Sequence, residues 1–299
     1  MRLLLVPHEF NAWCQLHPKE VYSLFFKAIW HTLSQFSHSH KRLQGQLGVT
    51  CVLHTWGQNL QRHVHMHCLI PGVALKPGQD AIETTQSDYL YPVNALKKAF
   101  RGKMVSLLRA AWKQGELFRI TRANDVSQVL DTVMGKRWSV YIKPYLKNPE
   151  TVVKYLARYT YRIAISNYRI IKIDQDSIYF HWKDYADNNR KKVMKLDGVE
   201  FLRRFLMHVL PSGFMRIRHY GFLANCVRQV RIEQLRILLK KAGVLSKVSL
   251  LVTPPEPGSS STCLCSSCKQ GFMKTVYQIS SLKDRRRRQS MIYQSTIAA

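Results

Sequence analysis

In the segment 63–67, histidines alternate with apolar residues, and a Pro-Gly pair follows shortly after it. This pattern predicts a β-strand with His63, His65 and His67 on one face, while apolar side chains such as Val64 and Met66 anchor the other face in the core. Imidazoles two residues apart on a strand can converge on one ion, and neutral imidazole is a common ligand of divalent metals. The pattern therefore favours a metal site over a solvated sheet face that carries histidines by chance.

Two tyrosines four residues apart, Tyr155 and Tyr159, form a second group that could do chemistry. They lie in a predicted helix that begins near 148–150, where Asn, Pro and Glu supply an N-cap, a first-turn proline and a first-turn acid. The spacing places both phenols on one face of this helix, with Arg158 and Arg162 each three residues after a tyrosine.

A tyrosine in this setting is a candidate nucleophile toward a phosphodiester. A phenol with an ordinary pKa near 10 is a poor nucleophile at neutral pH, but a metal that polarises the phosphate and nearby guanidinium groups reduce the barrier. Attack on phosphorus would form a 5′-phosphotyrosine, free a 3′-hydroxyl and conserve the bond energy for rejoining. The alternative is that these tyrosines are core or interface residues.

The composition indicates a globular protein with a polyanionic partner. The chain has 299 residues, 46% of them hydrophobic, and carries 46 Lys and Arg against 18 Asp and Glu, a formal net charge of +28. Aromatic residues interleave with the bases, and no long apolar span or lipidation signal is present, so nucleic acid rather than a membrane is the expected partner. Seven cysteines without a secretion signal indicate a reducing compartment, and we expect a cytoplasmic, nucleoid-associated protein.

Periodicity and turn residues predict alternating strands and helices around these groups. Strands are predicted at 3–6, in two antiparallel runs within 47–72, and at 138–143, 169–173, 178–182 and 191–195. Helices are predicted at 18–36, 93–113, 197–210 and 223–241, and a loop at 73–91. The bases of helix 93–113 belong to a solvated face or contact phosphate, and the sequence leaves both readings open.

The C-terminal part has a different composition. Residues after Val252 are rich in Pro, Ser and Gly, which indicates a linker. Cys265 and Cys268 then form one Cys-x-x-Cys pair, with an extra thiol at Cys263. A zinc site usually needs two such pairs, so these cysteines supply half of a Zn²⁺ site or belong to a reduced surface loop. The arginines at 285–288 are interpreted as a flexible basic tail with nonspecific affinity for DNA.

Longer phrases carry a family resemblance. The histidine strand, His-Thr-Trp-Gly-Gln-Asn-Leu at 54–60, the tyrosine segment 154–166 and the segment 205–222 together resemble the two-tyrosine HUH transposases of rolling-circle insertion sequences. The resemblance covers roughly residues 5 to 230. It implies an α+β fold with an HUH-type antiparallel sheet flanked by helices. Periodicity and composition add a helical C-terminal part and a flexible basic tail. The corresponding parts are a catalytic core at 1–195, a helical extension at 196–250, and a linker with a Cys-containing tail at 251–299.

The resemblance also implies roles for individual residues. His65 and His67 correspond to the metal ligands, with Mg²⁺ or Mn²⁺ as the expected ion, and Tyr155 and Tyr159 correspond to the nucleophiles. The expected partner is DNA, mainly the single-stranded ends of a mobile element and the target. Three bases of the tyrosine helix are expected to contact this DNA: Lys154, Arg158 and Arg162.

The resemblance does not assign the third metal ligand to a single residue. HUH nucleases commonly take it from a nearby polar residue, and Gln58 is the choice here over His54 or His63. Val64 stands where a proline is common before the motif, and His63 creates a second His-x-His register.

Two other departures bear on function. The family usually carries an upstream cysteine-rich zinc-binding domain that this sequence does not contain, which suggests a truncated or decayed element. Tyr161 adds a third tyrosine, expected to face away from the other two. The main expectation is a metal-dependent transposase that nicks and rejoins single DNA strands. The alternatives are a catalytically inactive DNA-binding remnant, and a replication initiator or relaxase with the same chemistry.

Overall fold

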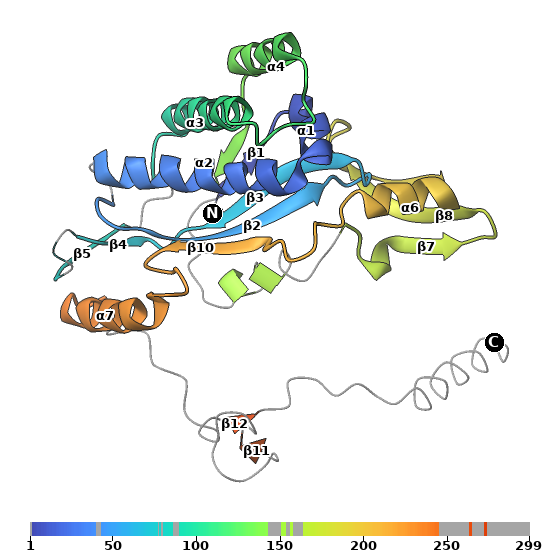
Figure 1. Ribbon diagram of the computed structural model, residues 1–299. Coiled ribbons are helices and arrows are strands. Elements are labelled where there is room, and N and C mark those ends of the chain that lie inside the picture. The colour runs from blue at the N-terminus through green and yellow to red at the C-terminus, as the bar shows by residue number, and fades with distance from the viewer. Residues whose placement is uncertain are drawn as a thin grey trace, which may run out of the picture. The chain divides into compact units, whose positions relative to one another are not determined.

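The computed structural model describes residues 2–39, 43–76, 78, 80–85, 90–142, 151–153, 156–157, 164–244, 263–264 and 272–273. The chain divides into two compact units, residues 1–245 and 246–299. The helices of the first unit whose bounds lie within these residues, coloured in chain order in Figure 1, are α1 (Asn11–Leu16), α2 (Pro18–Ser39), α3 (Val93–Lys113), α4 (Ala123–Gly135), α6 (Gly198–Leu206) and α7 (Arg228–Lys241), with short 3-10 helices η1 (His8–Phe10) and η2 (Asn167–Arg169).

The strands form several antiparallel sheets. Those of the first unit are β1 (Arg2–Leu5), β2 (Gly48–Trp56), β3 (Arg62–Leu69), β4 (Val73–Leu75), β5 (Ile82–Thr84), β6 (Val140–Ile142), β7 (Ile170–Ile173), β8 (Ser177–Asp184), β9 (Arg190–Asp197) and β10 (Ile217–Gly221). In the second unit, β11 (Cys263–Leu264) pairs with β12 (Phe272–Met273). The expectation of an α+β fold with antiparallel sheets flanked by helices and a helical C-terminal part is therefore confirmed.

The main sheet has five strands in the order β10-β2-β3-β1-β6. Strand β3, which carries the histidines, is its central strand and pairs with β2 on one side and β1 on the other. The edge strand β10 comes from a segment about 150 residues further along the chain. This central position gives the histidine strand hydrogen-bonded neighbours on both sides, so its backbone is fixed.

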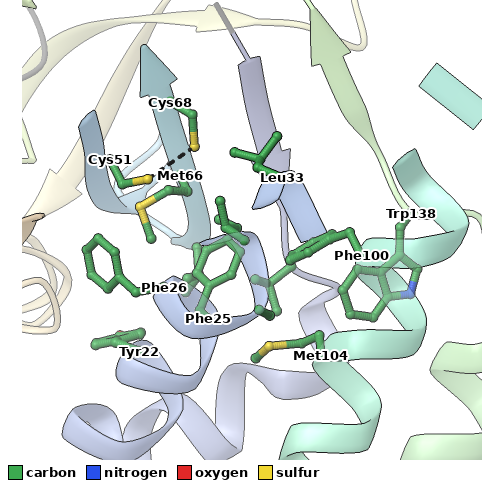
Figure 2. Close-up of a cluster of buried hydrophobic side chains, with 14 of the residues drawn as sticks. Tyr22, Phe25, Phe26, Leu33, Cys51, Met66, Cys68, Phe100, Met104 and Trp138 are labelled. Atoms are coloured by element: carbon green, nitrogen blue, oxygen red, sulfur yellow. Dashed lines mark hydrogen bonds between the residues drawn. The ribbon is translucent and has the colours of Figure 1, made fainter. Parts of the chain in front are cut away.

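One face of the main sheet packs against helices. Aromatic side chains of α2 and α3, including Phe25, Phe26 and Phe100, form the core with Met66 of β3 (Figure 2). The thiols of Cys51 on β2 and Cys68 on β3 lie 3.6 Å apart in the same layer. Because side chains alternate along a strand, burial of this apolar set directs the histidines to the opposite face, as the sequence predicts.

A second, smaller sheet of three strands, β7-β8-β9, follows in the chain. Its inner face packs against α6 through Phe180, Leu196 and Phe201, and Leu60 from the β2–β3 turn joins this cluster. The cluster is separate from the main core, so the small sheet is a distinct layer fastened to the end of the β2–β3 hairpin.

Some elements differ from the sequence prediction. The predicted loop 73–91 contains the β4–β5 hairpin, and α4 forms in a stretch without a predicted element. Strands of three residues are too short to establish a period, which explains the first difference. Strand β10 ends at Gly221, where φ is +62° and a Cβ atom would lie 1.7 Å from the Leu47 carbonyl oxygen, so only glycine fits.

The structure gives no support for a membrane-spanning helix. Among the helices within the described residues, none combines the length and the apolar character needed to cross a bilayer.

Candidate metal centre

Three histidines from two paired strands meet on the face of the main sheet opposite to the one that packs against α2 and α3. His54 on β2 lies directly opposite His65 on β3 in the strand register, and His67 follows two residues along β3. One ligand atom from each lies within 4.8 Å of the others. The ring centroid of His54 lies 5.2 Å from that of His65 and 4.6 Å from that of His67. The arrangement places three imidazoles where they could hold one metal ion.

The imidazole of His65 is prepared as a neutral ligand. Its Nδ1 atom lies 2.7 Å from the backbone carbonyl oxygen of His63, and since a carbonyl only accepts, Nδ1 carries the proton. Burial, together with the neighbouring His54, lowers the pKa of His65 to about 3. At neutral pH its Nε2 atom therefore carries a lone pair, which is the form that binds a metal.

A cavity of about 640 Å³ opens over the histidines. His54, His63, His65 and His67 line it from the main sheet, with Leu5 of the neighbouring strand β1. A second wall comes from the end of β2 with the β2–β3 turn, and from the small sheet and the segment before it: Trp56, Gln58, Ala164, Ile165, Ser166, Tyr168, Arg169 and Tyr185. The His54 ring is stacked on Trp56, with centroids 4.4 Å apart and planes at 19°. The indole thus limits the rotation of one candidate ligand.

Three side chains, from η2, from α6 and from the segment after α6, form hydrogen bonds to the β2–β3 turn that lines this cavity. Arg169 donates to the carbonyl of Gln58, Arg204 donates to that of Asn59 at 3.1 Å, and His208 Nε2 lies 3.0 Å from that of Leu60. Leu60 has a φ of +61°, a strained conformation for leucine, and its side chain is fully buried. These contacts fix the turn that carries Gln58.

The structure brings together several of the residues singled out in the sequence. His65 and His67 are 9% and 6% exposed and face the same cavity, whereas His63 is exposed on the rim. Gln58 lines the same cavity, with its Nε2 atom 3.5 Å from the hydroxyl of Tyr185, and stays a predicted ligand. His54, an alternative to Gln58 in the sequence analysis, is the third member of the histidine group.

Other predicted residues lie outside the described part of the chain. These are Tyr155, Tyr159, Lys154, Arg158, Arg162, Cys265 and Cys268. The helix start predicted at 148–150 also lies there, although residues 151–153 and 156–157 are helical. The backbone of Cys263 begins β11. The roles proposed for these residues remain predictions.

Sequence reasoning missed the second wall of the cavity. Arg169 and Tyr185 come from residues that precede β7 and follow β8, more than 100 positions after His65. Only the docking of the small sheet on the β2–β3 turn places them near the histidines. The one available signal was the excess of bases and aromatic residues in 168–195.

Acidification is expected to destabilise the metal-free protein through His65. Burial lowers the pKa of this residue from 6.5 to about 3, so between these values the unfolded chain binds a proton that the folded chain does not. The stabilisation is therefore present above pH 6.5 and is lost as the pH falls toward 3. The free energy of unfolding should drop by about 2 kcal/mol from this group between roughly pH 7 and pH 5.

Urea denaturation in EDTA at both pH values measures this drop. His65→Asn removes the titrating group and should reduce the pH dependence by the same amount. An unchanged dependence in this variant would show that His65 is not the group that resists protonation.

Comparisons with known proteins address the identity of the chain. The model of the family described as "Putative transposase" matches residues 48–231. A putative transposase, y4qJ, of Sinorhizobium fredii is 40% identical over 225 residues, which cover 73% of this chain and 56% of that protein. The transposase for insertion sequence element IS801 of Pseudomonas savastanoi pv. phaseolicola is 24% identical over 227 residues, 70% of this chain and 53% of that protein.

The chain thus spans about half the length of the curated relatives it matches. No solved structure matches it. The matched region 48–231 contains the three histidines and every described residue that lines the cavity over them except Leu5. By the extent of the family match and the identity to y4qJ, the resemblance to insertion-sequence transposases is confirmed, and the chain belongs to the putative transposase family.

Proposed function

We propose that this chain cuts and rejoins single DNA strands during transposition, through a 5′-phosphotyrosine intermediate and with one divalent ion. The observation that carries this proposal is the convergence of His54, His65 and His67 beside a cavity, in a strongly basic chain of the transposase family. A basic chain attracts the phosphate backbone, and a metal site in a cavity gives that backbone a place to react.

The donor set fits a divalent transition ion. His54, His65 and His67 would hold it, and Gln58, which lines the same cavity, offers an amide oxygen as a further ligand. Imidazole nitrogen suits transition ions better than Mg²⁺, which prefers oxygen ligands, so of the two ions expected from the sequence we favour Mn²⁺. When bound, such an ion supplies Lewis-acid polarisation of a phosphodiester and positions it.

The chain's own residues would perform the transfer. In the proposed step the phenolic oxygen of Tyr155 forms a bond to phosphorus, the bond from phosphorus to the 3′-oxygen breaks, and the phenolic proton ends on the 3′-hydroxyl. A second such exchange at Tyr159 holds another strand end, and attack by a 3′-hydroxyl on either phosphotyrosine rejoins DNA. Lys154, Arg158 and Arg162 are proposed to contact the phosphates of the same strand.

The test is a search for covalent adducts. The full chain is mixed with labelled single-stranded DNA from an end of the element, with Mn²⁺ or with EDTA, and run under denaturing conditions. We expect a protein-linked label with Mn²⁺ and none with EDTA, and removal of the label by phosphodiesterase. DNA binding without any adduct would overturn the proposal in favour of the catalytically inactive DNA-binding alternative. Adducts that need a fixed origin sequence, without strand transfer, would favour an initiator or relaxase.

A further inference from the structure

We propose that the outward face of the β7-β8-β9 sheet is a binding surface for single-stranded DNA, on which bases stack and phosphates contact lysines on the way to the histidine cavity. This inference rests on the proposed function for the single-stranded form of the DNA. We define the lysine–tyrosine face as the outward-pointing lysines of this sheet together with Tyr179, His181 and Val193; the lysines are Lys172, Lys183, Lys191 and Lys195.

The strand register assigns these residues to one face. Phe180 of β8 points inward to the cluster with α6, so its neighbour Tyr179 points outward. Tyr179 is directly opposite Lys195 of β9 and Lys172 of β7. Two and four residues further along, His181 faces Val193 and Lys183 faces Lys191. Both lysines of that last pair are exposed, as is the side chain of Val193.

The centre of the face is an aromatic ring between two cations. The ammonium nitrogens of Lys172 and Lys195 lie 4.8 and 5.6 Å from the centroid of the Tyr179 ring. Nucleic-acid-binding sheets use this combination, in which an aromatic ring stacks on a nucleobase and adjacent basic side chains contact phosphate. Stacking accepts any base, which suits a surface that guides a strand.

Part of the positive charge on this face is not paired with carboxylates of the protein. Among the described residues, Asp174 forms an ion pair with Lys172, but no carboxylate pairs with Lys183 or Lys191. On the inner face, Lys192 forms ion pairs with Asp184 and Asp187. Like charges directly opposite each other destabilise a sheet, so the pair formed by Lys183 and Lys191 carries a cost that a bound polyanion would relieve.

The face continues into the cavity of the metal centre. The ammonium group of Lys183 lies 5.9 Å from the centroid of the Tyr185 ring, and the Tyr185 hydroxyl lies 3.5 Å from Gln58. Both Tyr185 and Gln58 line the cavity with the three histidines. At about 3.4 Å per residue, Tyr179 is roughly 20 Å along β8 from Tyr185, which leaves room for several nucleotides outside the cavity.

The positive charge of the lysine–tyrosine face, together with its aromatic ring, favours single-stranded DNA over other binding partners. A second copy of this chain carries the same net charge of +28, and an association through this cationic face would be repelled. An apolar peptide would leave the lysines uncompensated. Duplex DNA offers phosphates but not open base faces for Tyr179, whereas a single strand offers both.

The test measures binding alone. Anisotropy of a labelled oligothymidylate is recorded with the full chain in EDTA, at several salt concentrations. Tyr179→Ala should weaken binding by about 5- to 100-fold, and Tyr179→Phe should stay within about twofold. Lys191→Gln should reduce the slope of log affinity against log salt by about 0.7. Lys192→Gln is the matched control, because it removes the same charge from the neighbouring position on the inner face and should leave the slope unchanged.

Each other outcome overturns the inference. Equal effects of Lys191→Gln and Lys192→Gln would show a response to net charge alone, and unchanged binding by Tyr179→Ala would exclude stacking. Displacement by duplex DNA or by polyglutamate as effective as by unlabelled oligothymidylate would point to another partner. Circular dichroism and thermal unfolding of each variant check folding, and Lys191→Gln supplies the test if Tyr179→Ala does not fold.

The outcomes separate this inference from the proposed function. If the wild-type chain binds DNA through this face but forms no adduct with Mn²⁺, the strand-transfer proposal is wrong and the binding-surface proposal stands. If the wild-type chain forms adducts but Tyr179→Ala binds DNA as well as wild type, only the binding-surface proposal is wrong.

Discussion

Replacing His67 with alanine is expected to abolish Mn²⁺-dependent adduct formation and to weaken Mn²⁺ binding at least about 100-fold. Loss of even an outer partner of a metal ligand usually costs 10- to 100-fold in affinity, so loss of a ligand should cost more. His67 is buried, and its ligand atom lies within 4.8 Å of those of the other two histidines. Isothermal titration with Mn²⁺ and the adduct assay measure the two effects.

His63→Ala is the matched control for this experiment. His63 belongs to the same strand and lines the same cavity, but its exposed ring is not part of the histidine group. Its backbone carbonyl, which orients His65, is retained by alanine. We expect less than about a threefold change, since the residue acts through its backbone. Equal losses in His63→Ala and His67→Ala would contradict the assignment of ligands.

The third ligand can be resolved with the same titration. His54→Ala should match the loss in His67→Ala if the ion is held by three imidazoles, whereas Gln58→Ala should then cost far less. The opposite order would restore Gln58 as the third ligand. Oligonucleotide binding in EDTA should be unchanged in all of these variants, which separates metal binding from folding and from DNA binding.

The histidine strand shows what a sequence pattern can and cannot establish. Alternation within 63–67 is enough to predict a strand with His65 and His67 on one face, because the period of a strand is short and local. His54 required the register of the β2–β3 hairpin, which has an irregularity between His54 and Trp56. Such an irregularity shifts which residues face each other, and the sequence carries no direct sign of it.

The small sheet shows the same limit at longer range. Its three strands were predictable from β-branched and aromatic runs separated by Asp and Asn turns. Its attachment depends on Arg169, Arg204 and His208 reaching the carbonyls of the β2–β3 turn, over sequence separations of more than 100 residues. These are individual polar contacts without periodicity, so the second wall of the cavity could only be found in three dimensions.

The tyrosine pair is the part of the proposed site for which the sequence alone provides the argument, and its substitution should have the largest effect on activity. We expect Tyr155→Phe to form no covalent adduct, because phenylalanine lacks the attacking oxygen. Tyr155 is one turn nearer than Tyr159 to the N-terminus of the predicted helix, where the helix dipole favours phenolate and phosphate. Tyr159→Phe should form an adduct but transfer strands poorly, since one end can be held while no second nucleophile cuts the other.

Tyr161→Phe is the control for this pair, because it removes the same hydroxyl from a position two residues after Tyr159, which lies about 200° around a helix from it. Its adducts and strand transfer should match wild type. In an assay with Mn²⁺ and single-stranded DNA of the element's end, adducts from the Tyr155→Phe, Tyr159→Phe double variant as abundant as from wild type would rule out the tyrosine mechanism. Adducts lost only in Tyr161→Phe would instead move the nucleophile to the opposite face of the helix, and the cavity over the histidines would then have to be approached from that face.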